Sequence, residues 1–220
     1  MKDRHEEKYL IDYVQYAALK AEVMKVLTPD PHGVQGSYVI TSLYYDDLMD
    51  TALLEKQDGL ARHTKFRLRT YDGREDLIKL ERKVKEGILT QKQTASVTRA
   101  QLPLLGVQTE PFTNDAFDLA AQMVAGGFRP AIAVRYRRDA FFYRGTDLRL
   151  TFDTNLEVLP AAEEALFDLS GAGIPVLDKN TVIMEIKYGT YVPDFVRLLT
   201  AIPSRQLSVS KYALCRETIV

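Results

Sequence analysis

The segment from Lys65 to Tyr71 carries basic side chains at alternate positions, and this spacing places them on one face of a β-strand. Side chains at i, i+2 and i+4 of a strand point to the same side of the sheet, so Lys65, Arg67 and Arg69 would form one row. Like charges at this spacing repel one another. A bound polyanion, with phosphate as the obvious candidate, would relieve the repulsion. A solvated outer face of an antiparallel sheet is the alternative explanation for a single strand.

Charged rows of the same kind recur along the chain, in at least six predicted strands. The other rows are Arg4/Glu6/Lys8, Lys79/Glu81/Lys83, one or more of Arg135, Arg137 and Arg138, Arg149/Thr151/Asp153, and Glu185/Lys187. They are denser in Arg, Lys and Glu than an ordinary outer face, and burying an unpaired charge costs on the order of several kcal/mol. A closed barrel with a water-filled lumen, lined by basic and acidic side chains, avoids that cost. Its basic side chains would bind phosphates and its acidic side chains would bind a divalent metal.

The elements that would position these rows follow from hydrophobic periodicity and turn residues. Strands are expected at 4–11, 37–45, 65–71, 77–84, 88–97, 131–143, 147–153 and 182–188, and helices at 13–27, 46–56, 115–125 and 193–201. Asp72-Gly73 predicts a hairpin turn, and 161–179 is expected to be irregular. The predicted class is α+β: an antiparallel closed β-barrel with peripheral helices, forming a single domain over residues 1–220.

The size, net charge and cysteine content of the chain exclude several classes of protein. With 220 residues the chain can bury a substantial core. Its net charge of -1 excludes a protein that binds polyanions nonspecifically through an overall positive charge. Any basic site must therefore form where basic side chains gather on one face of the protein. The single cysteine, Cys215, excludes an intrachain disulfide framework and is expected to be a buried apolar residue. The charged start of the chain and the absence of a run of about 18 apolar residues predict a cytoplasmic protein without a membrane span. Neither a Walker loop nor a dinucleotide-binding glycine motif occurs.

Short segments in a fixed order resemble a known family. They are Arg4–Tyr9, Ser42–Asp46, Lys65–Tyr71, Lys79–Lys83, Tyr136–Phe141, Arg149–Asp153, Met184–Tyr188 and Ser210-Lys211-Tyr212. Together they resemble the polyphosphate polymerase domain of the vacuolar transporter chaperone (VTC) family, within the triphosphate tunnel (CYTH-like) superfamily. The last of these segments favours the polymerase branch. Enzymes of the wider fold carry Glu-x-Glu-x-Lys near the N-terminus. Here Arg4 stands in place of the first acid, which weakens a thiamine-triphosphatase or adenylate-cyclase interpretation.

The resemblance implies an enzyme that transfers the γ-phosphoryl of ATP to a growing inorganic polyphosphate chain with Mn²⁺ or Mg²⁺ as cofactor. ATP and polyphosphate would be its partners, without nucleic acid and without direct membrane insertion, while a membrane or export partner on another chain is left open. The charged rows by themselves imply only phosphate binding and a metal. Two alternatives therefore stay open: a triphosphatase of the same fold, and a polyphosphate-binding module without turnover.

The candidate site residues combine the rows with the resemblance. The expected catalytic residues are Arg67, Arg69, Lys83, Arg138 and Glu185. The expected phosphate ligands are Lys8, Lys65, Arg67, Arg69, Lys79, Lys83, Arg138, Arg149, Lys187 and Lys211. Glu185 is the expected metal ligand, and Glu6, Glu81 and Asp153 would assist it or hold the basic side chains in place. The resemblance favours Arg138 on the inner face, with Arg135 and Arg137 outward. Tyr44 and Tyr71 are expected to be packing residues, and a solvated face or a structural ion pair is the alternative for each charged residue.

Overall fold

The computed structural model describes residues 5–87, 89–189, 192–194, 196–197, 205–206 and 210–219. Arg4 and most of the predicted helix at 193–201 lie outside the described residues. The chain divides into two compact units. Unit 1 comprises Met1–Val39, Tyr136–Leu156 and Leu177–Val209, and unit 2 comprises Ile40–Arg135, Glu157–Val176 and Ser210–Val220.

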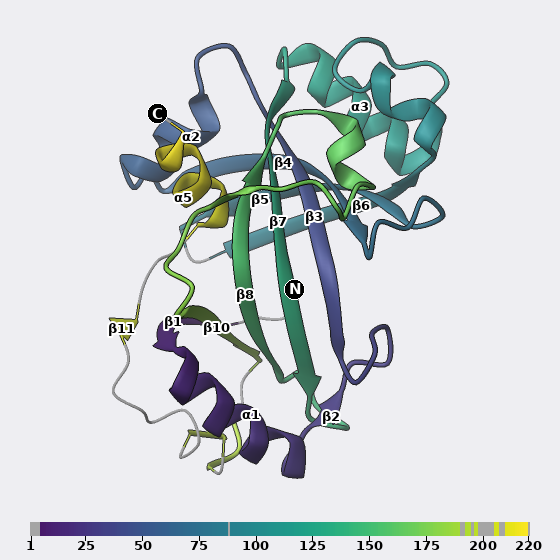
Figure 1. Ribbon diagram of the computed structural model, residues 1–220. Helices are drawn as coiled ribbons and strands as arrows, with labels where there is room; N and C mark the ends of the chain where they lie inside the picture. Colours follow the sequence, from purple (N-terminus) through teal and green to yellow (C-terminus); the bar gives the residue numbers. More distant parts are fainter. Residues whose placement is uncertain are drawn as a thin grey trace. The chain divides into compact units, whose positions relative to one another are not determined.

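Strands dominate the chain (Figure 1). They are β1 (His5–Asp12), β2 (Thr28–Pro29), β3 (Ser37–Asp46), β4 (Arg62–Tyr71), β5 (Ile78–Glu86), β6 (Leu89–Val97), β7 (Arg129–Phe142), β8 (Arg149–Leu159), β9 (Ile174–Pro175), β10 (Thr181–Tyr188) and β11 (Arg205–Gln206). The helices are α1 (Tyr13–Val26), α2 (Thr51–Gln57), α3 (Asn114–Ala125) and α5 (Lys211–Thr218), with short 3₁₀ turns η1 (Arg99–Leu104) and η2 (Glu163–Leu166). The segment predicted to be irregular therefore contains η2 and β9.

The described strands follow one hydrogen-bonded order, β11-β1-β10-β8-β7-β3-β4-β5-β6, with β2 beside β7 and β9 beside β8. The strand pairs with a defined register are antiparallel. The α+β class is thereby confirmed. Hydrogen-bonded closure into a barrel is not, because within the described part of the chain the end strands β6 and β11 pair with different neighbours and not with each other. The short β11, with two residues, offers few groups for such closure.

In unit 1 the helix α1 covers one side of the strands. Asp12 accepts a hydrogen bond from the backbone N–H of Gln15 at 2.7 Å, and the Gln15 side chain accepts one from the backbone N–H of Asp12 at 3.0 Å, which forms a capping box. Tyr16, Leu19 and Val23 then repeat at helical spacing and pack into a buried cluster with strand residues of β7, β8 and β10. The helix predicted at 13–27 is therefore confirmed.

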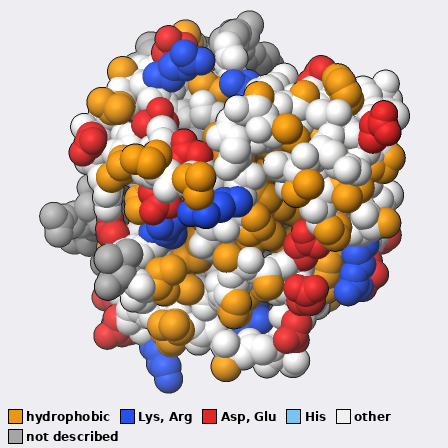
Figure 2. Space-filling view, turned by 90° about the horizontal axis from the view of Figure 1, so that it is seen from above, with side chains coloured by type: hydrophobic (Ala, Val, Ile, Leu, Met, Phe, Trp, Pro, Cys, Tyr) orange, Lys and Arg blue, Asp and Glu red, His pale blue; other side chains and the backbone are white. Residues whose placement is uncertain are grey.

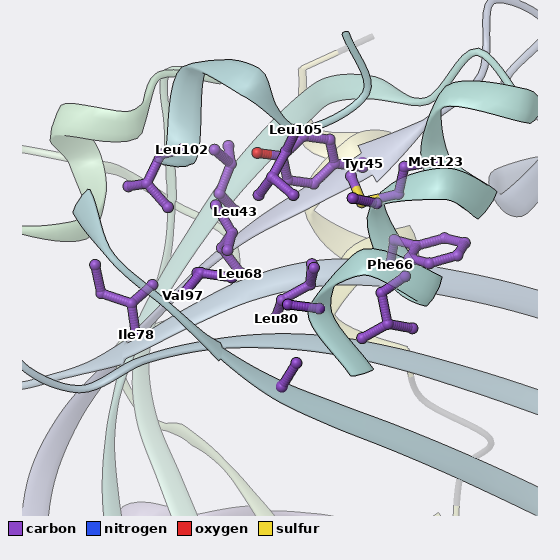
Figure 3. Packing of buried hydrophobic residues seen from close by; sticks show 14 of the residues in the cluster. Leu43, Tyr45, Phe66, Leu68, Ile78, Leu80, Val97, Leu102, Leu105 and Met123 are labelled. Atoms are coloured by element: carbon purple, nitrogen blue, oxygen red, sulfur yellow. The ribbon is translucent and has the colours of Figure 1, made fainter. Parts of the chain in front are cut away.

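In unit 2 the strands β3 to β6 bury one face beneath α3 and η1. Leu43, Phe66, Leu68 and Leu80 point into this core together with Met123 of α3 (Figure 3). The predicted hairpin turn between β4 and β5 is present, and Asp72 and Gly73 both adopt positive φ there. Because side chains alternate across a strand, burial of this set fixes the opposite set on the other face of the same strands.

The helix α2 starts later than predicted, because β3 continues through Asp46. The Asp46 carboxylate accepts hydrogen bonds from the backbone N–H groups of Ala52 at 2.9 Å and Leu53 at 3.2 Å. It thereby satisfies the Ala52 donor in the first turn of the helix and shares the Leu53 donor with the carbonyl oxygen of Asp50. The hydroxyl of Tyr212 on α5 donates to the same carboxylate.

Candidate functional site

The face of unit 2 opposite the hydrophobic core carries basic residues in register on three adjacent strands. Lys65 lies opposite Lys83, Arg67 opposite Glu81, and Arg69 opposite Lys79, while Lys92 of β6 lies opposite Lys83. We call this set the basic face: Lys65, Arg67, Arg69, Lys79, Glu81, Lys83 and Lys92. Six cations thus surround one carboxylate, and five of the predicted phosphate ligands are brought together.

Glu81 holds the centre of the basic face. Its carboxylate accepts from Arg67 Nε at 2.7 Å and from Lys92 Nζ at 2.5 Å, and lies 3.9 Å from Arg69 Nε. Burial would raise the pKa of Glu81, but the charges of Arg67, Arg69 and Lys92 outweigh it and lower the pKa to about 2. Glu81 is therefore ionised at neutral pH and orients the guanidinium groups, a role the sequence suggested for it.

The helix α5 lies beside the basic face of unit 2. Its N-cap residue Ser210 accepts from Lys65 Nζ at 3.0 Å, and the Lys65 ammonium lies 5.4 Å from the centre of the Tyr212 ring. Lys211 is close enough for its charge to lower the pKa of Tyr44, a buried phenol on β3. Lys211, a predicted phosphate ligand, therefore lies near β3, the strand that carries Tyr44.

One face of the strands of unit 1 carries acidic and basic side chains in equal number. Glu6 lies opposite Lys187 and Lys8 opposite Glu185 across β1 and β10, and Lys187 lies opposite Arg149 on β8. We call the following set the mixed face: Glu6, Lys8, Asp30, Arg138, Arg149, Asp153, Glu185 and Lys187. Its four cations and four carboxylates balance, in contrast to the basic face.

Each predicted phosphate ligand on the mixed face has an acidic partner. Arg138 donates to both oxygens of Asp153, at 2.7 and 2.8 Å, and both residues are buried. Burial would lower the pKa of Arg138, but Asp153 outweighs it and raises the pKa. Arg149 donates to Asp30 at 2.7 Å, and Lys8 lies 2.6 Å from Glu6. A ligand at these cations would therefore compete with carboxylates of the protein.

Glu185 is the predicted metal ligand, and its surroundings can be tested against that role. It is buried, it forms an ion pair with Lys187, and it lies opposite Thr151 on β8. The buried Thr151 hydroxyl has no hydrogen-bond partner among the described residues. Burial and the charge of Arg138 lower the pKa of Lys187 against the opposing effect of Glu185 and Glu6.

Oxygen donors at Glu185 and Thr151 suit a small divalent ion. Mg²⁺ usually takes one or two carboxylates and completes its shell with water and substrate phosphates, and Mn²⁺ prefers similar ligands. Within the described ranges, no group of three or more His, Cys, Asp or Glu side chains is placed to hold a metal. Glu185 and Thr151 would thus supply only part of the coordination shell of such an ion, and water or another ligand would complete it.

The three arginines of β7 have different environments. Arg138 lies on the mixed face, as the resemblance favoured. Arg137 is exposed and donates to Ser37 Oγ at 2.9 Å. Arg135 lies with Arg137 on the face of β7 opposite Arg138, and there it is buried in unit 2. It donates to Glu157 at 2.8 Å and to the carbonyl oxygens of Asp168 and Gly171. The reason is that β8 and the segment around η2 supply acceptors that desolvate and satisfy its guanidinium group.

Two residues that contact the charged faces were not predicted from the sequence as site residues. Tyr44 was expected to be a packing residue, yet its hydroxyl accepts from Arg67 Nη1 at 3.0 Å. Strand alternation places Tyr44 on the face opposite Leu43 and Tyr45, but its position opposite Arg67 comes from the pairing of β3 with β4. Asp30, the partner of Arg149, follows a short strand and has no recognisable motif. Cys215 is buried, as predicted, and burial raises its pKa to about 12.

Figure 2 shows acidic, basic and hydrophobic side chains interspersed on one side of the molecule. Because the net charge of the chain is -1, acidic groups elsewhere in the chain offset the cations of the basic face. None of the helices in the described ranges combines the length and the apolar character needed to cross a bilayer.

Comparison with known proteins gives the fold and the family. The PH1819 protein from Pyrococcus horikoshii OT3 is similar in structure, with a TM-score of 0.52 and 14% identity over 98% of this chain and 97% of that one. A Bacillus halodurans protein provisionally called an adenylate cyclase has a TM-score of 0.53 and 14% identity over 96% and 94%. At this identity the likeness shows the fold alone. No curated protein matches the sequence. The sequence profile of the VTC domain matches residues 3–220, so the chain belongs to the VTC domain family.

Proposed function

We propose that this protein is a polyphosphate polymerase that transfers the γ-phosphoryl group of ATP to the end of an inorganic polyphosphate chain. The observation that carries the proposal is the basic face of unit 2, where six cations on three adjacent strands surround Glu81. Membership of the VTC domain family agrees with it. ATP and polyphosphate are the proposed partners.

The shape of the basic face favours a linear anion over a single phosphate. Lys65 and Arg69 are four residues apart on β4, a span of about 13 Å at the usual rise of a strand. Arg67 lies between them, and Lys83 and Lys79 lie opposite the two ends. One phosphate group could contact only part of such a row, whereas a phosphate chain could contact all of it.

The proposed reaction needs positioning and charge neutralisation more than a covalent intermediate. A terminal oxygen of the polyphosphate chain attacks the γ-phosphorus of ATP, the bond to the β–γ bridging oxygen breaks, and ADP leaves. Arg67 and Arg69 would hold phosphate oxygens through their guanidinium N–H groups and stabilise charge on the transferred group. Glu185 is the proposed ligand of a Mg²⁺ or Mn²⁺ ion, which would supply further charge neutralisation.

Glu81 makes the two arginines suitable for this role. Because it is ionised and fixed between Arg67 and Arg69, it lowers the conformational freedom of both side chains before substrate arrives. A preorganised cation costs no reorganisation at the moment of reaction. The mixed face contributes no such surplus, since its cations already pair with carboxylates.

The test is product analysis with the purified protein. The protein is incubated with ATP and Mn²⁺ or Mg²⁺, with and without a tripolyphosphate primer, and the products are separated on a urea gel. A polyphosphate ladder supports the proposal. Orthophosphate without a ladder would instead identify a hydrolase, and unchanged ATP with retained polyphosphate binding would identify a binding module.

A pair of arginine variants controls for loss of charge alone. Arg67→Ala removes a member of the basic face and should abolish the ladder. Arg74→Ala removes an exposed arginine of the β4–β5 turn, which pairs with the exposed Asp76 at 2.5 Å, and should leave the ladder intact. Equal loss in both variants would argue against a specific role for the basic face.

A further inference from the structure

Tyr44 is a buried tyrosine that points toward the basic face. It lies opposite Arg67 in the register of β3 and β4, whereas its neighbours Leu43 and Tyr45 point into the hydrophobic core of unit 2. Its side chain is 7% exposed. Its ring lies 5.2 Å from the ring of Tyr212, so the phenol is held between β4 and α5.

The Tyr44 hydroxyl accepts a hydrogen bond, but it donates none to the described residues. Its oxygen accepts from Arg67 Nη1 at 3.0 Å, and the described residues provide no acceptor for its proton. A phenol can donate one hydrogen bond in addition to those it accepts. Burial of an unused donor is unfavourable, so the site is incomplete without a further acceptor.

The groups around Tyr44 cannot supply that acceptor. The charged groups acting on it are Arg67 and Arg69 of β4 and Lys211 of α5, which are donors only. Ser42, the next residue of β3 on the same face as Tyr44, accepts from Arg69 Nε at 3.4 Å. Glu81, the carboxylate that binds Arg67, is engaged by Arg67, Arg69 and Lys92.

The electrostatics of the site agree with this geometry. Burial would raise the pKa of Tyr44, but the charges of Arg67, Arg69 and Lys211 outweigh it and lower the pKa. The site therefore favours negative charge at the position of the phenol oxygen. An anion bound beside the hydroxyl would meet the same favourable potential and accept its proton in a hydrogen bond.

We propose that the Tyr44 hydroxyl donates a hydrogen bond directly to a phosphate oxygen of the chain bound on the basic face, which makes Tyr44 a substrate-binding residue. This inference rests on the proposed function, because it requires a phosphate chain on that face. Arg67 fixes the phenol through its oxygen and leaves the proton directed at the ligand. Tyr44 and Arg67 would then act together on the bound chain.

The test compares two adjacent tyrosines. Tyr44→Phe removes only the hydroxyl and keeps the ring contacts with Arg67 and Tyr212. Tyr45→Phe is the matched control. Tyr45 is also buried and its hydroxyl has no hydrogen-bond partner among the described residues, but its side chain points into the core. Binding of inorganic tripolyphosphate is measured by calorimetry at pH 7. We expect Tyr44→Phe to weaken binding about tenfold, as for loss of a hydrogen bond to a charged group, and Tyr45→Phe to change it less than about twofold.

A spectroscopic titration separates a ligand contact from a structural effect. Absorbance of tyrosinate near 295 nm is followed against pH, and the Tyr44→Phe curve is subtracted from that of the unaltered protein. The difference should show one phenol ionising below the usual pKa of about 10, and tripolyphosphate should move it upward because it neutralises the surrounding cations.

The outcomes distinguish this inference from the proposed function. If the unaltered protein binds no tripolyphosphate, both are overturned. If it binds, but Tyr44→Phe binds equally well or tripolyphosphate leaves the Tyr44 titration unmoved, the proposed function stands and the role of Tyr44 is overturned. Weaker binding together with the upward shift supports the inference.

Discussion

Replacement of Glu81 by Gln tests whether the carboxylate at the centre of the basic face stabilises the fold. The side chain is almost fully buried and contacts Arg67, Arg69 and Lys92. Glutamine has nearly the same shape but no charge, so the variant resembles the protein with Glu81 permanently protonated. Its stability relative to the unaltered protein should therefore depend on pH in a defined way.

The size of the expected change in the free energy of unfolding follows from the pKa of Glu81. A fall in the pKa from 4.5 in the unfolded chain to about 2 in the folded protein corresponds to about 3 kcal/mol of stabilisation at pH 7. Because the folded pKa is the lower one, this contribution is complete above pH 4.5 and is lost as the pH falls through 2. At pH 3 about 1 kcal/mol remains. The difference in the free energy of unfolding between the two proteins should therefore shrink by about 2 kcal/mol between pH 7 and pH 3.

Urea unfolding at pH 7, 5 and 3 measures this difference, with tyrosine fluorescence as the signal because the chain has 12 tyrosines and no tryptophan. Glu75→Gln is the control, since Glu75 forms an exposed ion pair with Arg99. Such surface pairs contribute about 1 kcal/mol or less. A difference for Glu81→Gln that is equal at pH 7 and pH 3 would refute the coupling between its ionisation and folding.

Three further predictions concern other charged residues of the two faces. Glu185→Gln should lower ATP turnover at least about a hundredfold while tripolyphosphate binding by calorimetry stays within about threefold, and equal loss of both would contradict its proposed metal role. Arg69→Lys keeps the charge but loses the planar fork, so tripolyphosphate affinity should fall about tenfold; unchanged affinity would mean that charge alone suffices. Arg138→Met leaves Asp153 buried without its partner and should lower the free energy of unfolding in urea by about 3–5 kcal/mol, whereas Arg138→Met/Asp153→Leu should recover much of that loss. Simple additivity of the two changes would refute their coupling.

Strand alternation made much of the candidate site predictable. Phe66, Leu68 and Leu80 are apolar residues interleaved with charged ones, and burial of the first set fixes the direction of the second. The row of Lys65, Arg67 and Arg69 therefore followed from local sequence, as did the hairpin that sets it opposite Lys79, Glu81 and Lys83.

Partners distant along the chain were not predictable in the same way. Arg135 is satisfied by Glu157 and by two carbonyl oxygens of the segment around η2, and alternation cannot show where such acceptors lie. The contact of Tyr44 with Arg67 needs the pairing of β3 with β4, across the intervening α2. Closure of the sheet depends on its two end strands, whose pairing has no local sequence signal.

The imbalance of charge on the basic face also affects how a ligand binds. Six cations around one carboxylate attract small anions from solution, and a phosphate chain in solution attracts small cations of its own. Their association would set both kinds of ion free, and the gain in entropy from this counterion release is the basis of salt-dependent binding to other linear polyanions. Each additional phosphate in contact would then increase the dependence of affinity on ionic strength. Buffers rich in phosphate or sulfate would hide the interaction by occupying the same cations.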